Sequence, residues 1–78
     1  MTQETINIGV YRILRKLGIS RQEIDPEADF DKDYFFDDAE KRMLFNFIEF
    51  RYQIQLSSND ENNIHKVKHL SQVIASKN

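Results

Sequence analysis

The chain has no cysteine and no tryptophan, and it contains only one proline and two glycines. The absence of cysteine excludes a disulfide framework, a thiolate zinc site and a cysteine nucleophile, so the fold must depend on packing. No apolar run approaches the roughly 20 residues that a membrane span needs, and the N-terminus is not a basic region followed by an apolar one. We therefore expect a cytoplasmic protein that is not anchored to a membrane.

The 78 residues suffice for one domain, because chains of this size bury only about 60% of the surface that they expose when unfolded. Apolar residues make up 40% of the chain and charged residues 31%, a composition suited to one small core. Paired carboxylates act as acid and base only in a cleft that separates their proton affinities, which a small bundle rarely provides. We expect a single domain over residues 1–78 without enzymatic activity.

Acidic residues are concentrated in the middle of the chain. Residues 23–40 contain nine Asp or Glu against Lys32 alone, a formal charge of −8, whereas the other residues carry ten Lys or Arg against four acids, +6, for a net −2. Phosphate neutralisation needs a dense positive field, and the basic residues are scattered. Nucleic acid is therefore not an expected partner. The acidic band is either a solvated loop or a site for a cation or a basic partner.

The clearest helix is at the N-terminus. Its apolar residues recur at helical spacing: Ile6, Val10, Ile13, Leu14 and Leu17. Thr2 is a plausible N-cap, and Gly18 followed by Ile19 is typical of a left-handed C-terminal residue with an apolar closing contact. These signals predict a helix over residues 3–17. Gly9 inside it suggests the close approach of another helix, because glycine is otherwise unfavourable there.

A loop and a second helix follow. Between residues 20 and 36 the periodicity fails and Pro26 interrupts any continuing helix, which predicts a long, ordered loop. Asp37 and Glu40 form a capping pair. A second helix should therefore begin near Asp38 and continue to Tyr52.

The C-terminal third contains a turn at residues 57–59, a short turn around residues 60–64 and a last helix over about 66–76. Phe35 and Phe36, at the end of the long loop, are expected to anchor it against the core. No segment is long enough to seed a sheet. The predicted fold class is all-α, a small bundle of three main helices plus one short helix.

This order of elements resembles that of the acyl carrier protein family. The run from residue 28 to residue 56 falls without gaps on the family consensus around its Asp-Ser-Leu motif. The matching residues are Phe30, Asp33, Asp37, Leu44, Ile48, Glu49, Tyr52, Ile54 and Leu56, with Ile64, Val67, Leu70 and Ile74 in the last two helices. The resemblance covers nearly the whole chain and implies an acyl-carrier-protein-like bundle in fatty acid, polyketide or related acyl-chain metabolism.

The motif differs at the residue on which carrier function depends. In the family its serine takes a phosphopantetheine arm, whereas here the triplet is Asp37-Asp38-Ala39, with Asp38 at the serine position. A carboxylate cannot replace the hydroxyl, because the modification is an attack of the serine oxygen on the pyrophosphate of coenzyme A. None of the five serines lies closer than 17 residues to Asp37. We therefore expect no phosphopantetheine cofactor.

The surface of the second helix also differs. In the family this helix is acidic, but here basic residues outnumber acids: Lys41, Arg42 and Arg51 against Glu40 and Glu49. Met43, Phe47 and Phe50 form an i, i+4, i+7 stripe apart from the face expected in the core. We interpret this stripe, with Asp38 and Arg42, as a binding surface for a protein partner. The alternative is that the stripe fills the acyl-chain cavity or belongs to an enlarged core.

The acidic loop also has the spacing of a calcium site. Five carboxylates fall at positions 1, 3, 5, 9 and 12 of an EF-hand loop: Asp29, Asp31, Asp33, Asp37 and Glu40. Tyr34 stands where the loop needs glycine, and Pro26 prevents an entering helix from abutting the loop. The loop is thus a weak metal-site candidate, for which weak, non-specific binding of divalent cations is favoured over a specific site. His65 and His69 have the i, i+4 spacing of zinc ligands, but they lack further ligands and are expected to be surface residues.

Three functional hypotheses remain open. The first is a non-carrier module that binds or regulates proteins, with enzymes of acyl-chain metabolism as the partners that the resemblance implies. The second is a genuine carrier that holds its cargo non-covalently or is modified elsewhere. The third is a divalent-cation-binding module that uses the acidic loop.

Overall fold

The computed structural model describes residues 2–77 of the chain, and its elements are helical. They are α1 (Gln3–Lys16), the 3-10 helix η1 (Arg21–Glu23), α2 (Asp38–Tyr52), α3 (Ser58–Asn62) and α4 (Val67–Lys77). No strand forms within residues 2–77, and one isolated bridge joins Asp29 to Lys66. The predicted all-α fold class is therefore confirmed. None of the helices in this part of the chain has the length and apolar character that a bilayer crossing requires.

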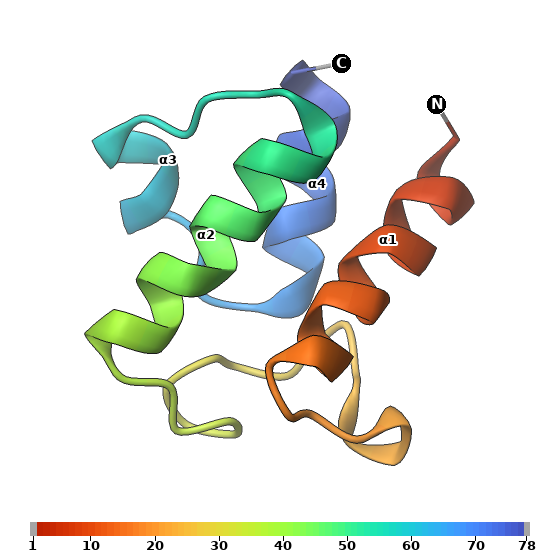
Figure 1. Ribbon diagram of the computed structural model, residues 1–78, viewed down its shortest axis with the longest axis vertical. Coiled ribbons are helices and arrows are strands. Elements are labelled where there is room, and N and C mark those ends of the chain that lie inside the picture. Colours follow the sequence, from red (N-terminus) through yellow and green to blue (C-terminus); the bar gives the residue numbers. More distant parts are fainter. Residues whose placement is uncertain (1, 78) are drawn as a thin grey trace.

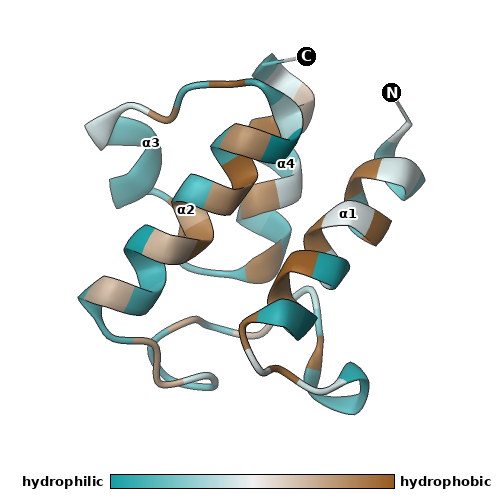
Figure 2. Ribbon diagram, in the orientation of Figure 1, coloured by the Kyte–Doolittle hydropathy of each residue, from teal (hydrophilic) through white to brown (hydrophobic). Residues whose placement is uncertain are grey.

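The three long helices form the body of the bundle. Figure 1 shows α2 lying between α1 and α3 in this view, while the connection from α1 to α2 passes across one end of the molecule. Apolar residues concentrate where the long helices face one another (Figure 2). The largest side chains with almost no exposed surface are Ile6, Val10, Leu14, Phe30, Leu44, Ile48, Val67, Leu70 and Ile74. The core therefore takes residues from α1, α2, α4 and the loop, as the periodicity predicts.

Both ends of α1 form as the sequence predicts, although the helix ends at Lys16. The Thr2 hydroxyl accepts a hydrogen bond from the Thr5 amide at 3.1 Å. At the other end Gly18 has a φ of 98°, and the Ile19 amide donates to the Leu14 carbonyl at 3.1 Å. Glycine is suited to this left-handed conformation because it has no Cβ.

Gly9 lies where α1 and α2 cross. A Cβ at this position would collide with the Tyr52 hydroxyl. That hydroxyl donates to the Ile6 carbonyl at 3.0 Å, which fixes the two helices against each other. The predicted close approach of a second helix at Gly9 is therefore confirmed.

The long loop is ordered by a cluster of aromatic rings. The rings of Phe30 and Phe36 stack with centroids 5.9 Å apart, and Tyr34 packs at 6.2 Å from Phe30. Phe36 is buried as predicted, but the prediction for Phe35 is wrong because its side chain is 80% exposed. Phe35 has a φ of 56°, and this turn directs its ring away from the core while the Phe36 amide bonds to the Phe30 carbonyl.

The loop also supplies the N-terminal cap of α4. The amides of Val67 and Lys68 donate to the carbonyls of Ala28 and Pro26 at 3.1 and 3.0 Å. In the opposite direction the Phe30 amide donates to the His65 carbonyl at 3.0 Å. Because the first amides of a helix have no partner inside it, these bonds satisfy donors that would otherwise need water or polar side chains.

Two boundaries differ from the prediction. Residues 57–59 are not a turn: the Ser57 hydroxyl accepts from the Asp60 amide at 3.0 Å, and the Asp60 carboxylate accepts from the Ser57 amide at 2.9 Å. This capping box starts α3 at Ser58, inside the segment expected to turn. The last helix occupies Val67–Lys77, one residue later at each end than predicted.

Candidate functional site

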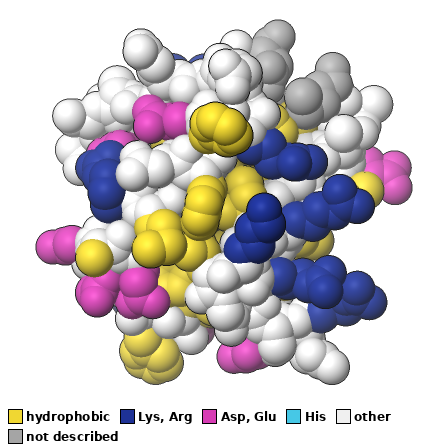
Figure 3. All heavy atoms as spheres, viewed as in Figure 1, with side chains coloured by type: hydrophobic (Ala, Val, Ile, Leu, Met, Phe, Trp, Pro, Cys, Tyr) yellow, Lys and Arg dark blue, Asp and Glu magenta, His cyan; other side chains and the backbone are white. Residues whose placement is uncertain are grey.

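An apolar stripe lies on the outer side of α2. Met43, Phe47 and Phe50 have 48%, 38% and 80% of their surface exposed, whereas Leu44 and Ile48 of the same helix are fully buried. Figure 3 shows a band of hydrophobic side chains across this face of the molecule. The stripe therefore neither fills an internal cavity nor belongs to the core, and that alternative is wrong.

A positively charged groove borders the stripe on the side of α1. Its volume is about 590 Å³, and its lining is Arg12, Ile13, Lys16, Phe47, Phe50, Arg51 and Gln53. Three of these seven residues are cations and none is an acid. Lys and Arg side chains gather beside the hydrophobic band in Figure 3. An apolar surface with a rim of one charge is suited to a partner of complementary charge.

Asp38 and Arg42, predicted to bind a partner together with the stripe, lie on a different side of α2. At 100° per residue Arg42 lies about 110° and Asp38 about 150° from the centre of the stripe. They line a pocket of about 330 Å³ between α2 and α3. Arg42 donates to both carboxylate oxygens of Glu61 at 2.8 and 2.9 Å and lies over the Phe45 ring. This bidentate pair raises the pKa of Arg42 and ties α2 to α3.

No hydroxyl side chain lines the pocket beside Asp38. Its nine lining residues are Asp31, Asp38, Lys41, Arg42, Phe45, Glu61, Asn62, Ile64 and His65. Asp38 itself is the first residue of α2, and its side chain is exposed. The surroundings of Asp38 therefore offer carboxylates and cations, but no alcohol nucleophile.

The carboxylates of the acidic loop bond to the chain around them. Asp29 accepts from the amides of Asp31 and Lys32 at 2.8 and 2.9 Å, and Asp33 accepts from the Asp29 amide at 2.7 Å. The pKa of Asp29 is lowered chiefly by the hydrogen bond from the Lys32 amide. These bonds shape the turn at residues 29–33.

The remaining predicted metal ligands are also engaged. Asp37 and Glu40 form the capping box of α2, with the Glu40 amide 2.8 Å from Asp37 and the Asp37 amide 3.1 Å from Glu40. Asp31 forms an ion pair with Lys41. Within residues 2–77 no three His, Asp or Glu side chains are placed to hold a metal ion together. The EF-hand spacing therefore does not produce a ligand cluster.

The side chain of His69 caps the start of α4, and the backbone of His65 is one of its partners. The Nδ1 atom of His69 accepts from the amides of His65 and Lys66, both at 3.0 Å. Burial lowers the pKa of His69, and the nearby cations lower it further. The i, i+4 spacing of the histidines does not predict this capping role, for which the signal in the sequence is a polar acceptor three residues after Lys66.

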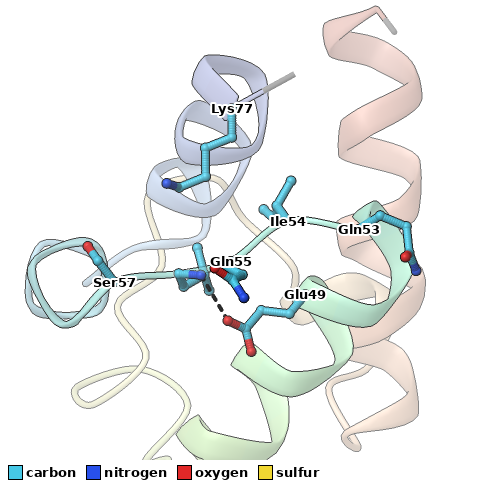
Figure 4. A pocket seen from close by; sticks show the side chains of 7 residues that line it. Glu49, Gln53, Ile54, Gln55, Ser57 and Lys77 are labelled. Atoms are coloured by element: carbon cyan, nitrogen blue, oxygen red, sulfur yellow. Dashed lines mark hydrogen bonds between the residues drawn. The ribbon is translucent and has the colours of Figure 1, made fainter.

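A polar cavity lies where α2 passes into α3. It measures about 670 Å³ and is lined by residues of α2, the following segment, the start of α3 and the end of α4. Figure 4 shows Glu49 directed toward the backbone of that segment, where its carboxylate accepts from the Leu56 amide at 2.8 Å. Lys77 is paired with Asp60 at 3.0 Å. Both charged groups thus have structural partners.

Comparison of the sequence with protein-family models returned no match, and no curated protein matches it.

Proposed function

We propose that the protein is a cytoplasmic acyl-carrier-protein-like module that carries no acyl chain on phosphopantetheine and instead binds a protein partner through the stripe on α2. The observation that carries this proposal is the exposure of Met43, Phe47 and Phe50 on the helix that starts at Asp38. The setting that the resemblance suggests is fatty acid or polyketide metabolism, with an enzyme of that metabolism as the partner.

The order of elements supports the kinship. The helix α1, a long acidic loop, α2, the short α3 and α4 follow one another as they do in the carrier family. The capping box at Asp37 places Asp38 at the first residue of α2, the expected position of the attachment serine. Because a carboxylate does not attack the pyrophosphate of coenzyme A, this chain should take no arm there.

The stripe offers apolar surface whose burial would favour association. Burying a side chain such as phenylalanine contributes about 1.5–3 kcal/mol, and a few central residues carry most of the energy of an interface. Phe50 is the most exposed residue of the stripe. Because the adjacent groove carries Arg12, Lys16 and Arg51, the matching surface of the partner should be apolar with an acidic rim.

Intact mass spectrometry tests the first half of the proposal. After incubation with coenzyme A and a broad phosphopantetheinyl transferase, the mass should stay unchanged, while an authentic acyl carrier protein in the same reaction gains the arm. A gain of that mass by this chain would show that it is a carrier.

Binding measurements test the second half. Purified enzymes that act on carrier-bound acyl chains are tested by biolayer interferometry against the wild type, Phe50→Glu and Phe35→Glu. Both phenylalanines are 80% exposed, but only Phe50 belongs to the stripe, so Phe35→Glu is a matched control. Phe50→Glu should lose binding and Phe35→Glu should keep it. Equal loss in both variants would exclude the stripe as the docking site, and no binding by any enzyme would exclude the metabolic setting.

A further inference from the structure

A second groove lies on the other side of α1, away from α2. It is formed by the outer face of α1 and the segment that contains η1, and its volume is about 370 Å³. We call it the arginine groove; its lining residues are Ile8, Tyr11, Arg12, Arg15, Arg21 and Ile24. In Figure 1 the segment that follows α1 turns back below the end of this helix. The groove therefore combines one helix face with a loop that folds against it.

The loop wall of the groove is held in place before any ligand arrives. The Ser20 hydroxyl donates to the Glu23 carboxylate at 2.6 Å. The Tyr34 hydroxyl donates to the Glu23 carbonyl at 2.8 Å and accepts from the Asp25 amide at 3.3 Å. Ile19 is buried in the core. Because these contacts fix η1 on both sides, a ligand would meet a preformed surface, and little ordering entropy would oppose its binding.

The groove carries an uncompensated positive charge. Within residues 2–77 none of its three arginines forms an ion pair with a carboxylate. Of the acids near η1, Glu23 bonds to Ser20, and Asp25 accepts from the Glu27 amide at 2.8 Å. Guanidinium groups bind carboxylates through two parallel hydrogen bonds, so three free ones favour an anionic partner.

The floor between these charges is apolar and accessible. Ile8 is 48% exposed, although it is a large hydrophobic residue, and Tyr11 and Ile24 are half-buried beside it. An isolated carboxylate would need only one arginine and would leave this floor in water. A small amphipathic molecule would remain half solvated, because pockets that bind small molecules usually enclose most of the ligand surface. A protein segment covers both the floor and the spaced charges.

We propose that the arginine groove binds a short acidic segment of a partner protein. One bulky apolar side chain of the segment lies against Ile8, Tyr11 and Ile24, and acidic residues on either side of it pair with the three arginines. This arrangement, an apolar anchor inside a charged rim, is the usual anatomy of a protein interface. The groove is separate from the stripe on α2, so the inference stands whether or not the stripe binds a partner.

The first experiment is a selection of random peptides displayed on phage against the full chain. The selection includes removal of peptides that bind the double variant Arg15→Glu/Arg21→Glu. Arg12 is left unchanged because it also lines the groove beside the stripe. The enriched peptides should share a bulky apolar residue flanked by Asp or Glu. Enrichment of neutral or basic peptides, or no enrichment, would overturn the proposal.

The second experiment measures the affinity of the best selected peptide by fluorescence polarisation. Arg15→Glu/Arg21→Glu and, separately, Ile8→Asp should each weaken binding about tenfold or more. The control Lys32→Glu/Lys77→Glu changes the charge by the same amount outside both grooves and should stay within about threefold of the wild type. Circular dichroism verifies that every variant is folded. If the control weakens binding equally, the effect comes from general electrostatics, and the arginine groove is not the binding site of the peptide.

Two further measurements distinguish a protein segment from other anionic ligands. Sodium dodecanoate should not displace the peptide, and phosphatidylglycerol vesicles should not sediment the chain. Displacement by dodecanoate would identify a small amphipathic anion as the ligand instead. Sedimentation that Arg15→Glu/Arg21→Glu abolishes would identify a lipid surface. Either result would overturn the assignment to a protein segment.

Discussion

Replacing Gly9 by alanine tests the contact between α1 and α2. The added Cβ would collide with the Tyr52 hydroxyl and would lie 2.8 Å from Nε of Arg51 and 3.1 Å from Cζ of Tyr52. The arginine can move aside because it is exposed. The tyrosine ring is 8% exposed and surrounded by close-packed side chains, so it cannot move without disturbing the core.

Three contributions determine the size of the effect on the free energy of unfolding. Alanine is more favourable than glycine inside a helix by about 1 kcal/mol. Overpacking against a buried ring destabilises by about 1–3 kcal/mol, and loss of the hydrogen bond from Tyr52 to the Ile6 carbonyl removes about 1 kcal/mol more. We therefore expect Gly9→Ala to lower the free energy of unfolding by about 1–3 kcal/mol.

Urea denaturation followed by circular dichroism measures this value in a double-mutant cycle. Tyr52→Phe removes the colliding oxygen, so Gly9→Ala should cost almost nothing in that background. The two changes should therefore couple by about 1 kcal/mol or more. If Gly9→Ala stabilises the wild type, helix propensity dominates and the contact is looser than described. An unchanged cost in the Tyr52→Phe background would also refute the role assigned to the hydroxyl.

Three other predictions concern the ends of the helices. Gly18→Ala should lower the free energy of unfolding by about 1 kcal/mol, measured in urea, because alanine is strained at the positive φ of this residue. Asp37→Ala should also lower the free energy of unfolding by about 1 kcal/mol. Asp37→Asn should keep most of the wild-type stability, since asparagine caps a helix well. His69→Ala should destabilise by about 1 kcal/mol at about pH 8. The folded state lowers the pKa of His69, so the unfolded chain binds the proton more readily. The extra stability of the wild type over His69→Ala should therefore decrease as the pH falls below the unfolded pKa of 6.5. The loss should be complete below the lowered pKa of the folded state. A stability difference between wild type and His69→Ala that does not change between about pH 8 and pH 5 would refute the cap.

The helices that the sequence predicts well are those whose signals are local. In α1 and α2 the apolar spacing and the caps at Thr2 and Asp37 lie within a few residues of one another, and both helices form where expected. The start of α3 depends on an equally local capping box at Ser57. The polar segment after it has no apolar face to indicate a helix, so the sequence pattern predicts a turn there instead.

Other features depend on contacts between distant segments. Phe35 and Phe36 are chemically alike, and only the pairing of the Phe36 ring with Phe30 decides which of them is buried. Likewise, the apolar residues of α2 cover more of the helix surface than the face that packs against the core. Which of them stay exposed is determined by where α1 and α4 pack, and the sequence does not give that arrangement. The arginine groove has the same origin, because it exists only where η1 folds back against α1.

The cap that the long loop provides for α4 affects how the protein opens. The amide of Val67 donates to the Ala28 carbonyl and that of Phe30 to the His65 carbonyl, so the two segments cannot separate without breaking these bonds and exposing buried rings. These amide hydrogens should therefore exchange with deuterium only when the whole chain unfolds, at the same rate as amides in the middle of α1. A segment without regular secondary structure would then belong to the slowest-exchanging unit of the molecule, and a protease that attacks only locally opened segments would spare it.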